Sequence, residues 1–149
     1  MNTINVLLVE DNPADARLVK EAIAECEVKH RVGLVNDGEE AMDYLYKKGK
    51  YENCETPSLI ILDLNMPRKN GREVLNEIRN DDGLNLIPII VLTTSDDRKD
   101  ICDSYKYSAN AFVTKPADFD EFIEVIHSFI DFWFNKAILP DRQMCKEMA

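Results

Sequence analysis

An α/β fold with a doubly wound parallel sheet is the architecture that the sequence predicts. Five short runs of apolar, mostly branched residues alternate with longer segments in which apolar residues recur three or four positions apart. Such runs are typical of strands buried on both faces, and helical crossovers between them favour a parallel sheet. The 149 residues, of which 45% are hydrophobic, suit a single domain. The predicted strands are residues 4–9, 30–35, 59–62, 88–92 and 111–113.

A helix is expected after each strand. Asn12 can cap the first helix, and Pro13 suits its first position because the N–H that proline lacks has no partner there. Gly33 weakens the second strand, since glycine has no side chain to pack. Asn70 and Gly71 mark a turn before the third helix. The expected helices are residues 13–25, 39–48, 71–78, 97–107 and 118–136.

The composition excludes several classes of function. With 28 acidic and 18 basic residues the formal net charge is −10, and no basic stripe is present to neutralise nucleic-acid phosphates. The same charge disfavours adhesion to an anionic membrane, and no apolar run approaches the roughly 20 residues of a membrane span. The N-terminal segment lacks the positive region of a signal peptide. We therefore expect a cytoplasmic protein that binds neither nucleic acid nor membrane.

Polar residues stand where the predicted strands end. Ligands of an open α/β sheet bind beyond the carboxyl ends of its strands. These ends gather three carboxylates, a hydroxyl and an ammonium group at one edge of the sheet. In chain order the residues are Glu10, Asp11, Asp63, Thr93 and Lys115.

This set of residues predicts a metal-dependent phosphoryl site. Three carboxylates at one edge repel one another, so a cation is expected among them, and oxygen ligands suit Mg²⁺ or Mn²⁺. A carboxylate beside a metal and a lysine is suited to attack a phosphoryl group. Taken singly, the residues also have ordinary explanations, such as a helix-start charge pair for Glu10 and Asp11 or a solvated Lys115. Asp63 is harder to explain in this way, because an acid directly after the run LIIL gains nothing for a core.

Five segments of the sequence resemble the successive signature segments of response-regulator receiver domains. They are VLLVEDN, LIILDLNMP, NGREVL, PIIVLTTS and FVTKP, and the resemblance runs from about residue 5 to residue 136. It implies a flavodoxin-like fold of five strand–helix units with the strand order 2-1-3-4-5. It also implies that residues 1–136 form the receiver domain and that residues 137–149 form a C-terminal tail, either an interface or disordered.

The resemblance assigns the central role to Asp63 as the phospho-acceptor. A histidine kinase would donate the phosphoryl group in a Mg²⁺-dependent reaction, and the domain would catalyse only this transfer to itself and its own slower dephosphorylation. The signal would leave through changed protein–protein interactions, without a DNA-binding output domain. The implied metal ligands are Glu10, Asp11, Asp63 and the backbone carbonyl oxygen of Asn65.

The resemblance also implies roles for the fourth and fifth strands. Thr93 would hydrogen-bond the phosphoryl group, and Lys115 would pair with it, with a cis bond before Pro116 turning the lysine inward. Thr93 and Phe112 would form the switch. Phe112 stands where the family often has a tyrosine, so it can swing inward when Thr93 moves but offers no hydroxyl to a partner. The alternative for Phe112 is an ordinary core residue.

Further segments are similar to a stand-alone subfamily that includes phytochrome-partner regulators. These are DYLYKKGKY, SYKYSANAF, DFWFNKAILP and a polar loop at residues 49–57 that is longer than in a typical receiver. The similarity implies a sensor histidine kinase of phytochrome type, or a related hybrid kinase, as the partner.

The last predicted helix is unusually apolar and points to a homodimer. Its large apolar residues span about 200° of the helix, whereas an ordinary surface helix needs an apolar stripe of about 100°. Either the tail folds back to cover the excess, with Ile138 and Leu139, or a second copy of the chain does so. We favour the second copy. The interface candidates are Phe122, Ile126, Phe129 and Trp133.

Three other functions fit the sequence less well. Phosphatases of the haloacid-dehalogenase class carry D-x-D, but here the motif is Asp63-Leu64-Asn65, and a carboxamide cannot act as a general acid–base catalyst. A docking module that has lost phosphorylation would lack one of the acids or the lysine. A flavodoxin would need a hydroxyl-rich phosphate loop after the first strand, where this chain has EDNP.

Overall fold

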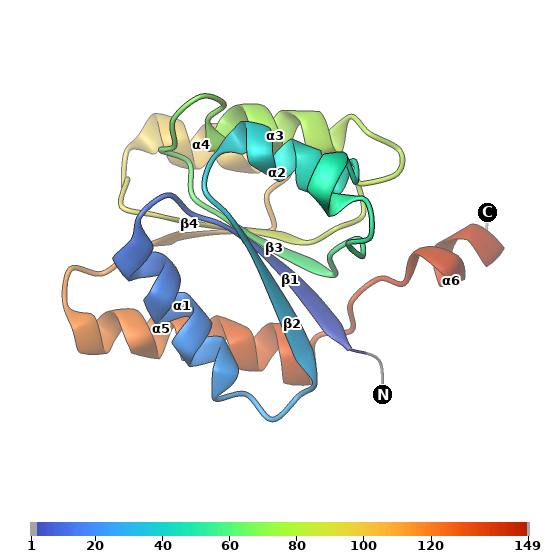
Figure 1. Ribbon diagram of the computed structural model, residues 1–149. Coiled ribbons are helices and arrows are strands. Elements are labelled where there is room, and N and C mark those ends of the chain that lie inside the picture. The colour runs from blue at the N-terminus through green and yellow to red at the C-terminus, as the bar shows by residue number, and fades with distance from the viewer. Residues whose placement is uncertain (1–2, 149) are drawn as a thin grey trace.

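Five parallel strands form one sheet between two layers of helices (Figure 1). The structure is a computed structural model that describes residues 3–148, so the outermost residues of the predicted domain and tail lie outside the described residues. The strand order is β2-β1-β3-β4-β5 with every neighbouring pair parallel, which confirms the predicted flavodoxin-like sheet. The strands are β1 (Ile4–Val9), β2 (His30–Val35), β3 (Leu59–Leu62), β4 (Ile89–Thr93) and β5 (Ala111–Thr114).

Helices cover both faces of the sheet. In Figure 1, α1 and α5 lie on one face, and α2, α3 and α4 lie on the other. The helices are α1 (Pro13–Ala24), α2 (Gly38–Leu45), α3 (Gly71–Arg79), α4 (Arg98–Lys106), α5 (Phe119–Asp131) and α6 (Arg142–Glu147). A 3₁₀ turn (η1, Gly49–Tyr51) follows α2, and a π turn (η2, Phe132–Lys136) continues α5. Over residues 3–148, no helix is both long and apolar enough to cross a membrane.

Local signals in the sequence explain where the helices begin. The Asn12 side chain accepts hydrogen bonds from the N–H groups of Ala14 and Asp15 at 3.0 and 3.1 Å, and Pro13 occupies the first helical position of α1. Asn70 caps α3 in the same way. Asn12 and Asn70 each end the loop that follows a strand, β1 and β3 respectively, so both caps help to fix loops at the carboxyl edge of the sheet.

Two helices, α2 and α5, end several residues before their predicted ends. α2 ends at Leu45 rather than at residue 48, because Lys47 adopts a positive φ of 58°, which takes the chain out of the helix. α5 is regular only as far as Asp131, and its last turn widens into η2.

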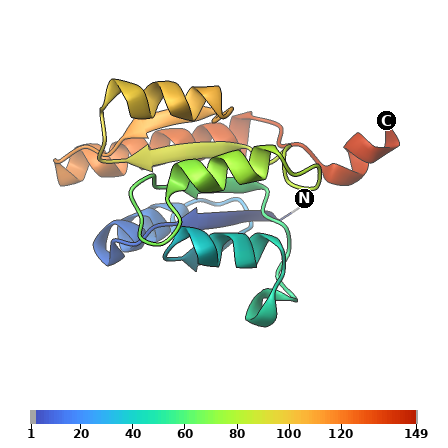
Figure 2. The ribbon, with the colours of Figure 1, turned by 90° about the horizontal axis from the view of Figure 1, so that it is seen from above.

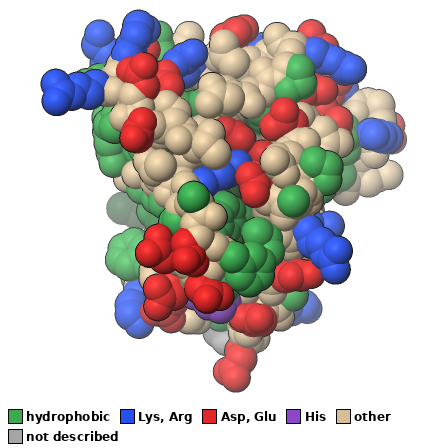
Figure 3. All heavy atoms as spheres, turned by 90° about the vertical axis from the view of Figure 1, so that its left-hand side faces the viewer, with side chains coloured by type: hydrophobic (Ala, Val, Ile, Leu, Met, Phe, Trp, Pro, Cys, Tyr) green, Lys and Arg blue, Asp and Glu red, His purple; other side chains and the backbone are tan. Residues whose placement is uncertain are grey.

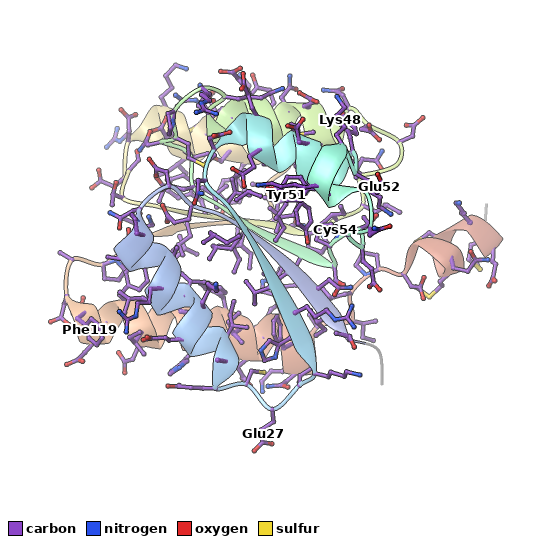
Figure 4. The ribbon with its side chains drawn as sticks, viewed as in Figure 1. Glu27, Lys48, Tyr51, Glu52, Cys54 and Phe119 are labelled. Carbon is purple, nitrogen blue, oxygen red and sulfur yellow. The ribbon has the colours of Figure 1, made fainter. Side chains whose placement is uncertain are left out.

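The long loop after α2 packs against the domain through Tyr51 (Figure 4). The ring centroids of Tyr51 and Tyr44 lie 5.1 Å apart, and the Tyr51 hydroxyl donates to a carboxylate oxygen of Glu40 at 2.6 Å. Both tyrosines pack against the core between the sheet and α2–α3. The loop therefore extends the core on this face.

The sheet separates two hydrophobic cores. Alternate residues of β1 point to opposite faces, with Leu7 in the core under α2 and α3, and Val6 in the core under α1 and α5. α3 approaches the sheet closely at Gly71, where a Cβ atom would lie 2.4 Å from the backbone oxygen of Asp63. Glycine at this position therefore lets the end of β3 pack directly against the start of α3.

Much of the apolar surface of α5 is buried inside the chain, which corrects part of the dimer prediction. Phe122 and Ile126 are only 4% and 0% exposed, because they pack into the core shared with α1 and the sheet. Phe129 and Trp133 are partly buried against the same core. Phe119 is 61% exposed and points away from the start of α5 (Figure 4). The apolar arc is wide because α5 faces both the sheet and α1.

The C-terminal tail does not fold back over α5. Ile138 is 92% exposed, and α6 extends away from the domain in two perpendicular views (Figures 1 and 2). The tail therefore leaves the outer face of α5 uncovered.

Candidate functional site

The carboxyl ends of the strands bring the predicted site residues together at one edge of the sheet. Glu10, Asp63, Thr93 and Lys115 are buried there, whereas Asp11 is exposed. Figure 3 looks onto this edge, where Lys or Arg atoms near the centre are flanked by Asp and Glu atoms. The edge is therefore charged and partly accessible from solvent.

Three carboxylates form a compact acidic cluster. One oxygen atom from each of Glu10, Asp11 and Asp63 lies within 4.8 Å of the others. Burial raises the pKa of Glu10 to about 7, against the hydrogen bond from Lys115 and with a contribution from the neighbouring Asp63. Additional positive charge is favoured at such a cluster, and its all-oxygen donor set fits a hard divalent cation.

Lys115 lies at the centre of the site. Its Nζ atom donates to Glu10 Oε1 at 2.5 Å, to Asp15 Oδ2 at 2.9 Å and to Asp63 Oδ2 at 3.2 Å, and its side chain is 4% exposed. Burial alone would lower the pKa of the ammonium group, but the hydrogen bonds to Glu10 and Asp15 and the charge of Asp63 raise it above its ordinary value. These contacts therefore favour the charged form of Lys115 in the site.

The predicted cis bond before Pro116 is wrong, because the structure has this bond in the trans form. Lys115 nevertheless points inward. Its backbone N–H donates to the carbonyl oxygen of Thr93 at 2.7 Å, which continues the pairing of β5 with β4 by one residue. This pairing and the three carboxylates hold the side chain in the site.

Thr93 presents an unpaired hydroxyl group. The residue is fully buried at the end of β4, and its Oγ1 atom has no hydrogen-bond partner among the described residues. Buried polar atoms are normally paired, since an unpaired one is unfavourable. An anionic ligand at this edge would give the hydroxyl a partner.

Backbone groups also contribute to the site. The N–H of Asn65 donates to Asp63 Oδ1 at 3.2 Å, so the loop after β3 folds back onto the carboxylate. Phe112, the predicted switch residue, is half-buried and packs against the core under α3. Its N–H donates at 3.2 Å to the hydroxyl of Tyr105, a residue of α4 that is 53% exposed. A phenol therefore lies beside Phe112 although that residue carries none.

Asp15 is a site residue that the sequence reasoning missed. It lies in the first turn of α1, and its carboxylate reaches Lys115 because α1 starts at the same edge of the sheet. The available signal was the segment EDNPAD, in which a third acid follows the helix cap by three residues.

Comparison with protein families and known proteins gives a consistent picture. The family model "Response regulator receiver domain" matches residues 6–127. The response regulator Rcp1 of Synechocystis sp. is 41% identical over 135 residues, which cover 91% of this chain and 92% of Rcp1.

Solved structures agree with the sequence comparison. The crystal structure of the Mn²⁺-bound form of Rcp1 has a TM-score of 0.90 with 40% identity, and covers 93% of this chain and 99% of that one. The phosphorylated cyanobacterial phytochrome response regulator RcpA has a TM-score of 0.91 with 45% identity, and the match covers 94% and 100% of the two chains.

Proposed function

Because the chain belongs to the response regulator receiver domain family, whose members signal in two-component systems, we propose that Asp63 accepts a phosphoryl group from the phosphohistidine of a sensor histidine kinase. A carboxylate oxygen of Asp63 attacks the phosphorus atom and forms a P–O bond. The P–N bond to the histidine breaks, and its electron pair stays on the imidazole nitrogen. The observation that carries the proposal is the buried Asp63 carboxylate, 3.2 Å from the Lys115 ammonium at the carboxyl edge of the sheet.

The acidic cluster is a divalent-metal site of the receiver type, in line with the Mn²⁺-bound form of Rcp1. We propose that Glu10, Asp11, Asp63 and the backbone carbonyl oxygen of Asn65 hold Mg²⁺ or Mn²⁺. When bound, the cation offsets the charge of the transferred phosphoryl oxygens. The compact cluster of carboxylate oxygens supports this assignment.

Lys115 and Thr93 complete the binding of the phosphoryl group in this proposal. The ammonium of Lys115 pairs with one phosphoryl oxygen, and the unpaired hydroxyl of Thr93 donates to another. Movement of Thr93 toward the phosphoryl group leaves space for Phe112 to turn inward, which alters the surface formed by α4 and β5. Phosphorylation thereby changes the affinity for a protein partner.

Intact-mass measurement after incubation with acetyl phosphate and Mg²⁺ tests the proposal. We expect the mass of one added phosphoryl group, and we expect this adduct to disappear when the divalent cation is removed with EDTA. Mn²⁺ should restore it. If no adduct forms and the mimic beryllium fluoride also fails to bind, the domain does not act as a phospho-acceptor.

The partner and setting follow from the same proposal. The kinase is of phytochrome type or a related hybrid, in keeping with RcpA as a phytochrome response regulator, and the reaction takes place in the cytoplasm. Residues 1–136 act as the receiver domain, and residues 137–149 form a tail outside it.

The domain is a signalling protein and not an enzyme acting on other substrates, since the amide of Asn65 stands where a haloacid-dehalogenase-type phosphatase needs its acid–base catalyst.

We further propose that the chain forms a homodimer through the outer side of α5 and η2. Phe132 is 50% exposed, Phe129 and Trp133 are partly exposed beside it, and α6 leaves this surface uncovered.

Sedimentation velocity tests the dimer and should give a mass near twice 17.1 kDa. Phe132→Ser should lower it toward the monomer, while Phe119→Ser, at the other end of α5, should not. A monomer at high micromolar concentration, with and without phosphorylation, contradicts the dimer.

A further inference from the structure

Lys115 is bound by three carboxylates, and Asp15 is the one that the phosphorylation chemistry does not otherwise use. A lysine ammonium group has three N–H donors, and here Glu10, Asp15 and Asp63 each accept at 3.2 Å or less. The three contacts together fix the position of Nζ. A divalent cation and a phosphoryl group in the site would affect these three contacts differently.

Two of the three partners have a second task. Glu10 and Asp63 belong to the acidic cluster with Asp11, so both would share their charge with a divalent cation held there. Asp63 would also give up its carboxylate charge when one of its oxygen atoms becomes the bridging oxygen of the acyl phosphate. Asp15 lies outside the cluster, and among the described residues the partner of its carboxylate is Lys115. It is therefore the partner whose charge neither the cation nor the phosphoryl group would share.

The position of Asp15 is itself well fixed. Its backbone N–H donates to the side chain of Asn12 at 3.1 Å, within the capped first turn of α1. The Asp15 side chain is only 22% exposed and that of Lys115 4%, so the ion pair is much less screened than a surface pair. The negative charge also lies at the N-terminal end of a helix, where the helix dipole favours it.

From this geometry we infer that Asp15 is a positioning residue, which holds the Lys115 ammonium against an oxygen of the phosphoryl group on Asp63. The inference rests on the proposed function and adds a fourth carboxylate to it. Asp15 acts through Lys115 and touches neither the metal nor the phosphoryl group. The role requires an acceptor atom at this position, and the negative charge of Asp15 strengthens the contact.

Beryllium fluoride binding in saturating Mg²⁺ tests the inference. Asp15→Ala removes the acceptor and should weaken binding about tenfold, as expected for the loss of one charge-assisted hydrogen bond. Asp15→Asn keeps a carbonyl oxygen acceptor without the charge and should recover part of the affinity. Glu21→Ala, which removes an exposed carboxylate from the same helix, is the matched control and should bind like the wild type.

Two further readouts separate positioning from a general structural effect. The Mg²⁺ affinity measured by calorimetry without beryllium fluoride should change little in Asp15→Ala, because Asp15 is outside the metal cluster. The ¹⁵Nζ resonance of Lys115, protected from exchange by its hydrogen bonds, should be visible in the wild type and in Asp15→Asn but broadened in Asp15→Ala.

The outcomes are distinct. If Asp15→Ala binds beryllium fluoride as well as the wild type does, Asp15 has no positioning role and the inference is overturned, while the proposed function stands. Tighter binding by both Asp15 variants would also overturn it, because the charge of Asp15 would then oppose the phosphoryl group. If the wild type itself binds neither beryllium fluoride nor a phosphoryl group, the proposed function fails and the inference falls with it.

Discussion

Asp63→Asn is expected to abolish the phosphoryl adduct that the wild type forms with acetyl phosphate and Mg²⁺. The amide keeps the size and position of the side chain, but it lacks the anionic oxygen that attacks phosphorus. It also removes one of the three negative charges of the acidic cluster, so stabilisation by Mg²⁺ in thermal unfolding should be smaller than in the wild type. Intact mass and a Mg²⁺ titration of the melting temperature measure the two effects.

The control for this change is Asp82→Asn, an exposed aspartate in the connection between α3 and β4. It removes the same charge outside the acidic cluster and should leave both the adduct and the Mg²⁺ effect unchanged. An adduct that persists in Asp63→Asn would place the phosphoryl group on another residue, and peptide mapping would identify it. That result would remove Asp63 from its central role.

The sheet and most of the site could be predicted from the sequence because both depend on short-range patterns. The apolar runs fix the strands, and a parallel sheet places the residues after them at one edge. That rule alone brings Glu10, Asp63 and Lys115 together, as the structure shows. The Asn12 cap and Pro13 likewise set the start of α1 from local chemistry.

Features that depend on packing between distant elements could not be predicted in this way. The contact between Asp15 and Lys115 joins residues 100 positions apart and depends on where the first turn of α1 lies relative to β5. The apolar arc of α5 was visible in the sequence, but helical spacing does not say whether Phe122 faces the core or a partner. The burial of Phe122 follows from the packing of α5 against α1 and the sheet.

Lys115→Met is expected to have the largest effect on stability. The methionine fills the space of the lysine stem but leaves the carboxylates of Glu10 and Asp63 buried without their counter-charge. Breaking a buried ion pair from one side costs about 3–5 kcal/mol, which lowers the melting temperature by roughly 10 °C in a domain of this size. Millimolar Mg²⁺ should return part of the loss, because the cation supplies positive charge to the same carboxylates.

Lys20→Met is the matched control, since Lys20 is an exposed lysine of α1 and the substitution should change the melting temperature little. The Mg²⁺-dependent recovery is the decisive part of the experiment. Simple loss of packing at position 115 would lower stability to the same extent with and without Mg²⁺. A larger Mg²⁺ effect in Lys115→Met than in the wild type would show that the lysine and the cation neutralise the same acidic cluster. Lys115 would then be the positive charge that stabilises the acidic cluster when no metal ion is bound. The remaining negative charge of the cluster would serve phosphoryl transfer.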